Sequence, residues 1–246
     1  PERHFRMAAP YLISVAPVPF TKVWGGHQLA GIVDLQDPPN EPIGEVWSLS
    51  ALPGHSCPVV NGALAGLPLD EALAQLEVDL PRPFPVLLKM LETTEPISLQ
   101  LHPGDALARK RGHACGKSEA WLILKATAEA RVFHGLKAAS SDSPGAAAAP
   151  PETGDLAGFL KAVRENAADV TKYLRTFPVR EGDVIPVPPG TVHSTTGGLV
   201  WVEVQQSADL TYRMYDWGRT GREMHIEQAL EALIPRPLPG VPLSGL

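Results

Sequence analysis

Three short stretches of this chain carry residue types that could hold a metal ion. The first is Ser98-Leu99-Gln100-Leu101-His102, in which polar and apolar residues alternate. On a β-strand this alternation puts Ser98, Gln100 and His102 on one face. Imidazole nitrogen and amide oxygen both ligate metals, so this face predicts a polar, metal-binding interior if the strand turns it inward. A hydrogen-bonded core histidine is the alternative for this stretch taken alone.

The second stretch combines glycine, proline and histidine at fixed spacing. Gly182 is followed by Pro188, Gly190 and His193. We expect a hairpin, with a turn at Gly182 and a bend at the proline and glycine residues, whose following strand presents His193 to the interior. These four spaced positions match the second motif of the cupin superfamily, although Gly197 stands where that motif often ends in asparagine.

The third stretch brings a carboxylate to the start of a predicted strand. Glu119 follows Gly116-Lys117-Ser118 and precedes a hydrophobic run. Taken alone, such a run is typical of a solvated turn. Together with His102 and His193, however, Glu119 completes a set of two imidazoles and one carboxylate, which suits a divalent metal and leaves positions for Gln100 and for substrate or water.

The elements that must position these residues are mostly short strands. The chain has 26 prolines and 22 glycines, and they fall between short apolar runs. This pattern favours a mainly β fold, a sandwich or barrel that leaves few open sheet edges, with a few peripheral helices. The predicted strands are Val46–Ala51, Ile97–His102, Ala120–Lys125, Ala130–Phe133, Thr176–Pro178, Asp183–Val187 and Leu199–Gln205. The predicted helices are Pro68–Leu76, Leu156–Ala167, with Asp155 as its cap, and Ile226–Leu233.

Composition limits the classes of partner and the compartment. The 246 residues are 44% hydrophobic and 20% charged with a net charge of -6, so no global basic field favours nucleic acid. No apolar run is long enough to span a membrane. The two cysteines, Cys57 and Cys115, lack the spacing and density of a disulfide scaffold, so we expect free thiols and a cytoplasmic protein.

The chain is expected to form a single unit over residues 1–246 with its metal site drawn from residues 98–121 and 182–205. Residues 1–6, before Met7, are typical of a short added tag. Residues 138–154 are small and almost uncharged, which predicts a flexible connection.

In these segments and their order the sequence resembles the type I phosphomannose isomerase family in its short bacterial form. The resemblance extends from about residue 12 to about residue 233. The matching segments are Lys22–Gly26, Gly44–Ser50, Pro85–Lys89, Gln100 with His102, Gly116–Trp121, Pro188–His193 and Glu203–Arg213.

The resemblance implies a cupin-type jelly-roll β-barrel, monomeric or weakly oligomeric, that binds one Zn²⁺ and interconverts mannose 6-phosphate and fructose 6-phosphate. It implies Gln100, His102, Glu119 and His193 as the metal-binding positions, although Gln100 could instead orient a histidine from outside the metal's ligand set. It also implies that Arg213 acts in catalysis.

An aldose–ketose isomerisation needs a base, an electrophile and a phosphate anchor. For the base, Glu203 is the first choice and Lys117 the second. A structural carboxylate paired with Arg213 is the alternative role for Glu203. The resemblance places Lys89, Ser98, Lys117, Arg213 and Arg219 around the sugar phosphate, with the roles of Arg213 and Arg219 open to exchange. Residues 109–111 are expected to form a solvated loop.

Two other functions use the same residues. Another cupin enzyme, either a different sugar-phosphate isomerase or an iron dioxygenase, could use the same ligands. A non-catalytic sugar-phosphate sensor would keep the barrel. The lysine and arginine complement favours an anionic sugar, and the complete set of ligands together with Arg213 favours an enzyme.

Overall fold

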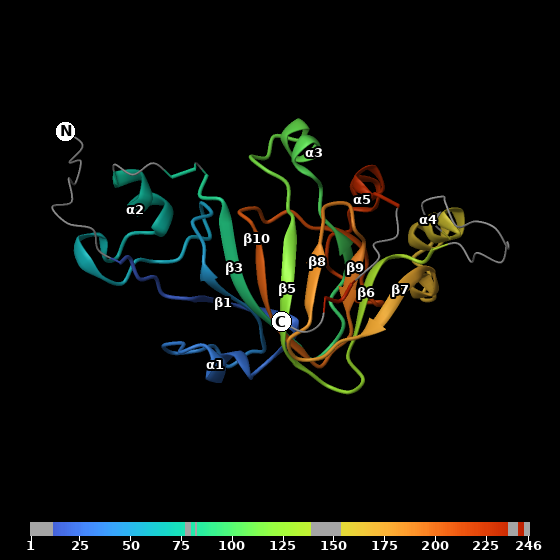
Figure 1. Cartoon of the computed structure of the whole chain (residues 1–246), viewed down its shortest axis with the longest axis horizontal. Coiled ribbons are helices and arrows are strands. Elements are labelled where there is room, and N and C mark those ends of the chain that lie inside the picture. Colours follow the sequence, from blue (N-terminus) through green and yellow to red (C-terminus); the bar gives the residue numbers. More distant parts are fainter. Residues whose placement is uncertain (1–11, 77–79, 82, 139–153, 236–240, 244–246) are drawn as a thin grey trace.

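Two antiparallel sheets form the centre of the molecule, and the helices lie around them (Figure 1). The computed structural model describes residues 12–76, 80–81, 83–138, 154–235 and 241–243. Residues 1–6 and all but the two ends of the expected connection 138–154 lie outside the described residues. Within the described part, no helix is both long and apolar enough to cross a membrane.

The larger sheet has six strands in the order β1-β2-β3-β10-β5-β8. Its strands are β1 (Val18–Gly26), β2 (Ile43–Leu49), β3 (Val86–Thr93), β10 (Leu199–Gln206), β5 (Glu119–Ala126) and β8 (Val184–Val187). Strand β10 is central because it pairs with β3 from Leu199 to Gln206 and with β5 from Leu199 to Gln205. Residues from distant parts of the sequence therefore become neighbours across this sheet.

The smaller sheet has five strands in the order β11-β4-β9-β6-β7. Its strands are β11 (Tyr212–Tyr215), β4 (Leu99–Leu101), β9 (His193–Thr195), β6 (Arg131–Leu136) and β7 (Leu174–Pro178). The register places Gln100 opposite His193, and His193 opposite His134. Side chains that lie directly opposite one another share a face, so these three lie on the same side of the sheet.

The inner faces of the two sheets enclose a core of aromatic and branched side chains. Trp121 and Ile123 of β5, Trp201 of β10 and Val132 of β6 are all buried in one cluster there. The mainly β fold expected from the sequence is confirmed, because strands dominate both layers of this core. Polar residues lie beside this core, where β4 ends and where β5 and β9 begin.

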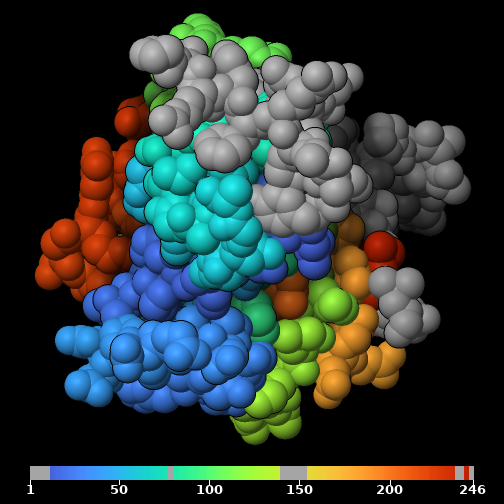
Figure 2. Space-filling model, turned by 90° about the vertical axis from the view of Figure 1, so that its left-hand side faces the viewer, coloured from blue at the N-terminus to red at the C-terminus, as the bar shows by residue number. Residues whose placement is uncertain are grey.

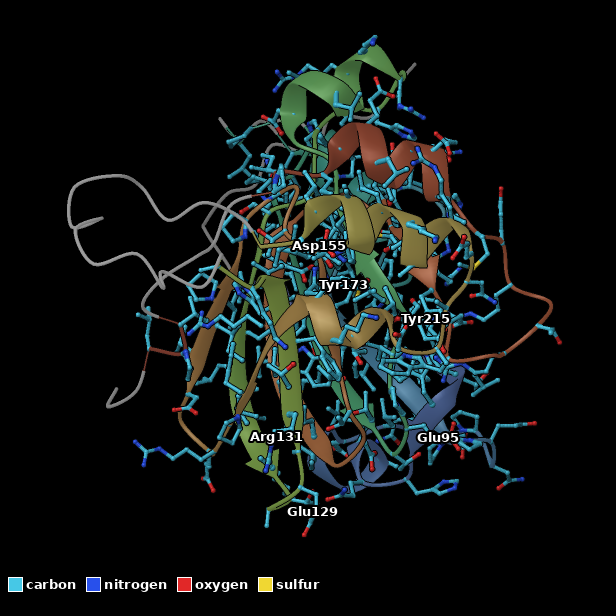
Figure 3. All side chains as sticks on the ribbon, turned by 90° about the vertical axis from the view of Figure 1, so that its right-hand side faces the viewer. Glu95, Glu129, Arg131, Asp155, Tyr173 and Tyr215 are labelled. Carbon is cyan, nitrogen blue, oxygen red and sulfur yellow. The ribbon has the colours of Figure 1, made fainter. Side chains whose placement is uncertain are left out.

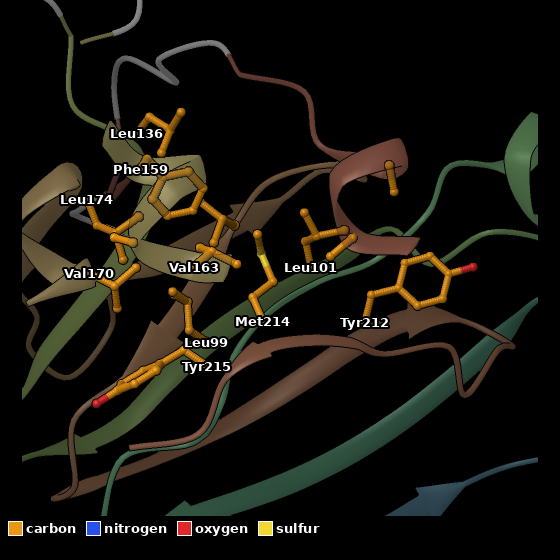
Figure 4. Close-up of a cluster of buried hydrophobic side chains, with 14 residues drawn as sticks. Leu99, Leu101, Leu136, Phe159, Val163, Val170, Leu174, Tyr212, Met214 and Tyr215 are labelled. Carbon is orange, nitrogen blue, oxygen red and sulfur yellow. The ribbon is translucent and has the colours of Figure 1, made fainter. Parts of the chain in front are cut away.

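The helices lie at the faces and the ends of the two sheets (Figure 1). They are α1 (Leu29–Ile32), α2 (Leu69–Gln75), α3 (Asp105–Lys110), α4 (Leu156–Arg164) and α5 (Ile226–Ala232), with 3₁₀ turns at Gly62–Leu64 and Val170–Tyr173. Phe159 and Val163 of α4 pack with Leu99, Leu101 and Met214 on the outside of the smaller sheet (Figure 4). The N-terminal residues, from blue to cyan, form most of the opposite side of the molecule (Figure 2).

Two expectations about local structure are wrong. Strands β8 and β9 do not form a hairpin: β8 pairs with β5 in one sheet, while β9 lies between β4 and β6 in the other. The Pro188–Gly190 bend, with Gly190 at φ +76°, carries the chain from one sheet to the other. Residues 109–110 belong to α3 and not to a loop, although their side chains are exposed to solvent as expected; Arg109 pairs with Asp105 one turn earlier, and Lys110 pairs with Glu231.

Candidate active site

Two histidines and one glutamate meet in the interior between the two sheets. His102 follows β4, Glu119 begins β5 and His193 begins β9. The Nε2 atom of His102 lies 3.3 Å from Glu119 Oε2, and that of His193 lies 3.4 Å from Glu119 Oε1. All three side chains are buried, and their ligand atoms lie within 4.8 Å of one another. The smaller sheet supplies the imidazoles and the larger sheet supplies the carboxylate.

Backbone hydrogen bonds orient both imidazoles toward Glu119. His102 Nδ1 lies 2.7 Å from the carbonyl oxygen of Leu210, and His193 Nδ1 lies 2.9 Å from that of Thr191. A carbonyl only accepts hydrogen bonds, so each Nδ1 carries the proton and each Nε2 presents a lone pair. His102 Nε2 is buried with no hydrogen-bond partner among the described residues, and the buried Glu119 Oε2 beside it is contacted by the Lys117 ammonium at 3.0 Å without a well-oriented hydrogen bond. Buried polar atoms left in this way fit a metal ion between them.

The protonation states suit metal binding as well. Burial, helped by the nearby charge of Lys117, lowers the pKa of His102, and burial lowers that of His193 to about 3. Burial alone would raise the pKa of Glu119, but Lys117 and His102 outweigh it and hold that pKa well below its usual range. At neutral pH the cluster therefore consists of two neutral imidazoles and one carboxylate, the forms that ligate a divalent cation.

Gln100 and Ser98 extend the polar face of β4. The Ser98 hydroxyl donates to Gln100 Oε1 at 2.9 Å, and Gln100 Nε2 lies 3.5 Å from His193 Nε2. The amide therefore lies beside the cluster, as the alternation in the sequence predicts. An exchange of its oxygen and nitrogen, which have nearly the same shape, would turn the oxygen toward the cluster.

A cavity of about 340 Å³ lies beside this cluster: Gln100 and Lys117, which contact His193 and Glu119, line it, whereas the three clustered residues do not. Its lining joins both sheets with the segment after β10. The lining residues are Lys22, Trp24, Glu45, Lys89, Leu91, Ile97, Ser98, Gln100, Lys117, Trp121, Trp201, Glu203, Asp209, Thr211, Arg213, Arg222 and His225. This volume lies at the lower end of the range for small-molecule sites. The lining combines aromatic walls with many charges, which suits a small, polar, anionic ligand.

Charged side chains alternate along the inner face of the larger sheet. Lys117 Nζ lies 3.0 Å from Glu119 Oε2 and 3.5 Å from Glu203 Oε1. Lys89 Nζ lies 3.9 Å from Glu203 Oε1 and 3.3 Å from Glu45 Oε2, and Lys22 Nζ lies 3.4 Å from Glu45 Oε1. We call these six residues the charge row. Glu203 thus pairs with two lysines, and no ion pair joins it to Arg213.

Burial and neighbouring charges set the pKa values within the charge row. Burial and the Glu119 carboxylate raise the pKa of Glu203, although Lys117 and Lys89 oppose the shift. Burial alone would lower the pKa of Lys117, but the Glu119 and Glu203 carboxylates outweigh it and raise that pKa above its ordinary value. Lys117 is therefore held as a cation, while Glu203 is a more basic carboxylate than an exposed glutamate.

Three arginines follow one another near the mouth of the cavity, and the structure separates their surroundings. Arg213 and Arg222 line the cavity, whereas Arg219 does not. Arg219 donates to the Asp216 carboxylate at 2.7 Å, and Arg222 Nη1 contacts both oxygens of Asp216 at 3.0 and 3.1 Å. Of the residues assigned from the sequence, Arg219 is thus the one that lies apart from the others.

Arg213 differs from the other cations that line the cavity. Its Nη1 donates to the backbone oxygen of Glu223 at 2.5 Å, while its Nε is buried without a partner. Lys22, Lys89, Lys117 and Arg222 each have a carboxylate within 4.0 Å, and Arg213 has none among the described residues. Burial and the nearby charge of Arg222 lower the pKa of this guanidinium. It is therefore the cation best able to receive an anion.

Several lining residues were not assigned from the sequence. Lys22 and Trp24 come from β1, Glu45 from β2, and Arg222 and His225 from the segment after β11. Period-two alternation of Phe20, Lys22 and Trp24 was the available signal for β1, but Pro17 and Pro19 interrupt the strand pattern. Arg222 carried no signal of its own, because nothing in the sequence separates it from Arg219.

Comparison with known proteins places this geometry in a family. The profile "Phosphomannose isomerase type I, catalytic domain" matches residues 13–131. The mannose-6-phosphate isomerase of Streptococcus mutans is 34% identical over 239 residues, which cover 92% of this chain and 70% of that protein. The mannose-6-phosphate isomerase ManA of Bacillus subtilis is 30% identical, over 88% of this chain and 66% of that protein.

Solved structures agree with this placement. The mannose 6-phosphate isomerase structure from B. subtilis has a TM-score of 0.75 at 30% identity and covers 94% of this chain and 70% of that one. A putative mannosephosphate isomerase from Archaeoglobus fulgidus shares the fold at 22% identity, with a TM-score of 0.72 over 94% of this chain and 71% of that one. The expected cupin-type fold is confirmed by this match, and the chain belongs to the type I phosphomannose isomerase family.

Proposed function

We propose that this protein is a metal-dependent isomerase that interconverts mannose 6-phosphate and fructose 6-phosphate. The observation that carries the proposal is the buried cluster of His102, Glu119 and His193 next to a cavity that Gln100, Lys117 and Arg213 line, since Gln100 and Lys117 contact the cluster. Family membership supports the substrate, since the relatives in S. mutans and B. subtilis are mannose-6-phosphate isomerases. The chain spans 66–70% of the length of these relatives.

One zinc ion fits the cluster. His102 and His193 would each supply Nε2 and Glu119 a carboxylate oxygen, with Gln100 beside them as a further oxygen donor. Two imidazoles and one carboxylate are a typical ligand set for catalytic zinc with an open position. When bound there, such an ion supplies a Lewis acid for the sugar oxygens.

The reaction moves hydrogen between two neighbouring carbons. In mannose 6-phosphate a proton leaves C2 and the C2–H electron pair forms the C1=C2 bond of an enediol, while O1 gains a proton. A proton then adds to C1 and O2 loses its proton, which gives the ketone of fructose 6-phosphate. The protein must therefore hold a base near C1 and C2 and stabilise negative charge on the oxygens.

Glu203 fits the role of the base better than Lys117. Its carboxylate lines the cavity, is 4% exposed and has a raised pKa, so it is more basic than an exposed glutamate. Lys117 lies against two carboxylates, which keep it protonated. In that form it donates hydrogen bonds and orients Glu119 and Glu203, while Glu203 moves the proton.

Arg213 would stabilise charge on the substrate. Its guanidinium lines the cavity with no carboxylate within 4.0 Å among the described residues, so it has no anionic partner to give up when an anion binds. Ser98 and Lys89 line the same cavity and would complete the contacts to the sugar phosphate. Arg219 would contribute indirectly, through the Asp216 carboxylate that it shares with Arg222.

We also propose that the protein works in the cytoplasm as a monomer or weak oligomer. Cys57 and Cys115 are both free thiols, and Cys57 is buried, which supports a reducing compartment. Size-exclusion chromatography with light scattering would measure the oligomeric state.

A coupled assay tests the proposed reaction. Purified protein with one equivalent of Zn²⁺ should form fructose 6-phosphate from mannose 6-phosphate without oxygen or nucleotide, and a chelator should abolish turnover. Faster conversion of glucose 6-phosphate would assign a different aldose to the same chemistry. Oxygen consumption with a small acid, in the absence of isomerisation, would favour the dioxygenase alternative. Binding of the sugar phosphate without turnover would favour a sensor.

A further inference from the structure

The charge row contains one carboxylate whose purpose the reaction does not explain. Glu45 is on β2, two strands away from Glu203 on β10. Its Oε2 accepts the indole proton of Trp47 at 2.8 Å and lies 3.3 Å from Lys89 Nζ, while its Oε1 lies 3.4 Å from Lys22 Nζ. Both oxygens are thus engaged, and the side chain is fixed by partners on three strands.

Lys89 lies between two competing carboxylates. In the sheet register Lys89 is directly opposite Glu203 on one side and Trp47 on the other. Directly opposite side chains are the ones that pair most readily across a sheet. Nevertheless, Lys89 Nζ lies closer to Glu45, at 3.3 Å, than to Glu203, at 3.9 Å, and it lies 4.5 Å from the centre of the Trp47 ring. Glu45 and Trp47 together therefore draw the ammonium group away from its direct neighbour.

We infer that Glu45 is a positioning residue for this site, which acts through Lys89 to keep Glu203 weakly paired and in reach of the substrate. The inference rests on the proposed function, because it gives Glu203 the role of the base. Lys89 is 3% exposed and Glu203 is 4% exposed, so water screens their attraction little. If Lys89 closed fully on Glu203, it would stabilise the carboxylate as an anion and make it a weaker base.

The test is the variant Glu45→Gln, which keeps the shape of the side chain and removes its charge. Lys89 should then move toward Glu203, and a crystal structure of the variant should show the two at about 2.8 Å, a normal ion-pair distance. We expect kcat to fall about tenfold, with KM within about twofold of wild type, since the base and not the phosphate site is altered. The acidic limb of the kcat profile should move to lower pH.

The matched control is Glu92→Gln. Glu92 is a buried carboxylate on β3 that lies outside the cavity lining and accepts hydrogen bonds from the backbone of Gln28 and Leu29 at the start of α1. This variant should lower thermal stability while kcat and the pH profile stay at wild-type values. A purely structural role for Glu45 would give the same result in Glu45→Gln, and that result would overturn the inference.

Three further outcomes have defined consequences. A steep rise in KM with unchanged kcat would show that Glu45 contacts the substrate, which also overturns the positioning role. If Glu45→Gln does not fold, the same measurements on Glu45→Asp decide, because the shorter side chain keeps the charge but cannot hold Lys89 at its present place. If the wild-type protein shows no isomerase activity, the proposed function fails, and the distance between Lys89 and Glu203 in the variant still tests the positioning.

Discussion

At the scale of single residues, histidines 91 positions apart converge because β4 and β9 are neighbouring strands of the smaller sheet. The sequence predicted this convergence for His102, Glu119 and His193, since alternation and glycine–proline spacing mark inward-facing positions. It could not rank Arg219 against Arg222, because the loop after β11 alone decides which guanidinium reaches the cavity. Nor could it predict the ion-pair partners of Glu203, because Lys89 lies on β3 and Lys117 precedes β5.

Loss of either histidine should remove the metal. His102→Ala and His193→Ala each leave too few protein ligands for a firm site, so zinc content measured by mass spectrometry should fall from about one equivalent to near zero, and activity should fall with it. His134→Gln is the matched control, because His134 is buried opposite His193 but its Nε2 is bonded to the Pro186 oxygen. Full zinc content in either alanine variant would contradict the ligand assignment.

The kinetic effect of replacing Arg213 distinguishes an enzyme from a sensor. The guanidinium of Arg213 should interact more strongly with the transition state than with the bound sugar, so Arg213→Ala should lower kcat by about two orders of magnitude or more with a much smaller change in KM. Arg213→Lys keeps the charge but loses the planar fork and should recover only part of the rate. Zinc content should stay normal in both variants.

The control for Arg213 is Arg109→Ala, which removes an exposed arginine on α3 that pairs with Asp105. It should leave kcat and KM unchanged. A steep rise in KM with preserved kcat in Arg213→Ala would instead make Arg213 a phosphate anchor, and stabilisation of the transition state would pass to Lys117.

At the scale of elements, the sequence predicted the helices and strands that are marked by a local periodicity of apolar residues. Helices α2, α4 and α5 and seven strands lie where periodicity placed them, with ends that differ by up to a few residues. The strands that it missed are β1, interrupted by proline, β3, which has apolar residues on both faces, and the short β11, whereas the strand expected to present His193 is β9. Their pairing depends on neighbours distant in sequence, and no local pattern records such neighbours.

The cap of α4 offers a test of local structure. Asp155 precedes the helix on the outer side of the smaller sheet (Figure 3), and its Oδ1 accepts the backbone proton of Gly158 at 2.7 Å. Asp155→Ala should lower the free energy of unfolding by about 1 kcal/mol, as is typical for loss of an N-cap. Asp155→Asn retains the acceptor and should lose much less.

Activity should be unchanged in both Asp155 variants, because α4 packs on the outer face of the smaller sheet, away from the cavity. Chemical denaturation monitored by circular dichroism measures the first effect, and the coupled assay measures the second. A loss of activity in excess of the loss of folded protein would contradict this separation of α4 from the site.

At the scale of the whole molecule, the charge row joins the metal site to the far strand of the larger sheet. It passes through β5, β10, β3, β2 and β1, so it contributes to the pairing of five strands as well as to the chemistry. Buried ion pairs of this kind add little net stability when both partners are charged, but the fold is strongly destabilised when one partner loses its charge. Acid should therefore destabilise the fold through these carboxylates.

The effect of acid on stability can be measured at Glu45. Burial would raise its pKa, but Lys89 and Lys22 outweigh burial and lower the pKa to about 2 in the folded protein, against about 4.3 for an unfolded chain. A carboxyl group with a depressed folded pKa binds fewer protons when folded, so its contribution is fully present above about pH 4.3 and is lost as the pH falls toward 2. Glu45→Gln lacks that contribution at every pH.

The difference in unfolding free energy between wild type and Glu45→Gln should therefore shrink steadily between about pH 5 and pH 2. Urea denaturation at each pH measures this difference, and circular dichroism confirms that each protein is folded before urea is added. A difference that stays constant across this range would show that the Glu45 carboxylate has the same proton affinity in the folded and unfolded chains, and that the charge row does not hold it as an anion.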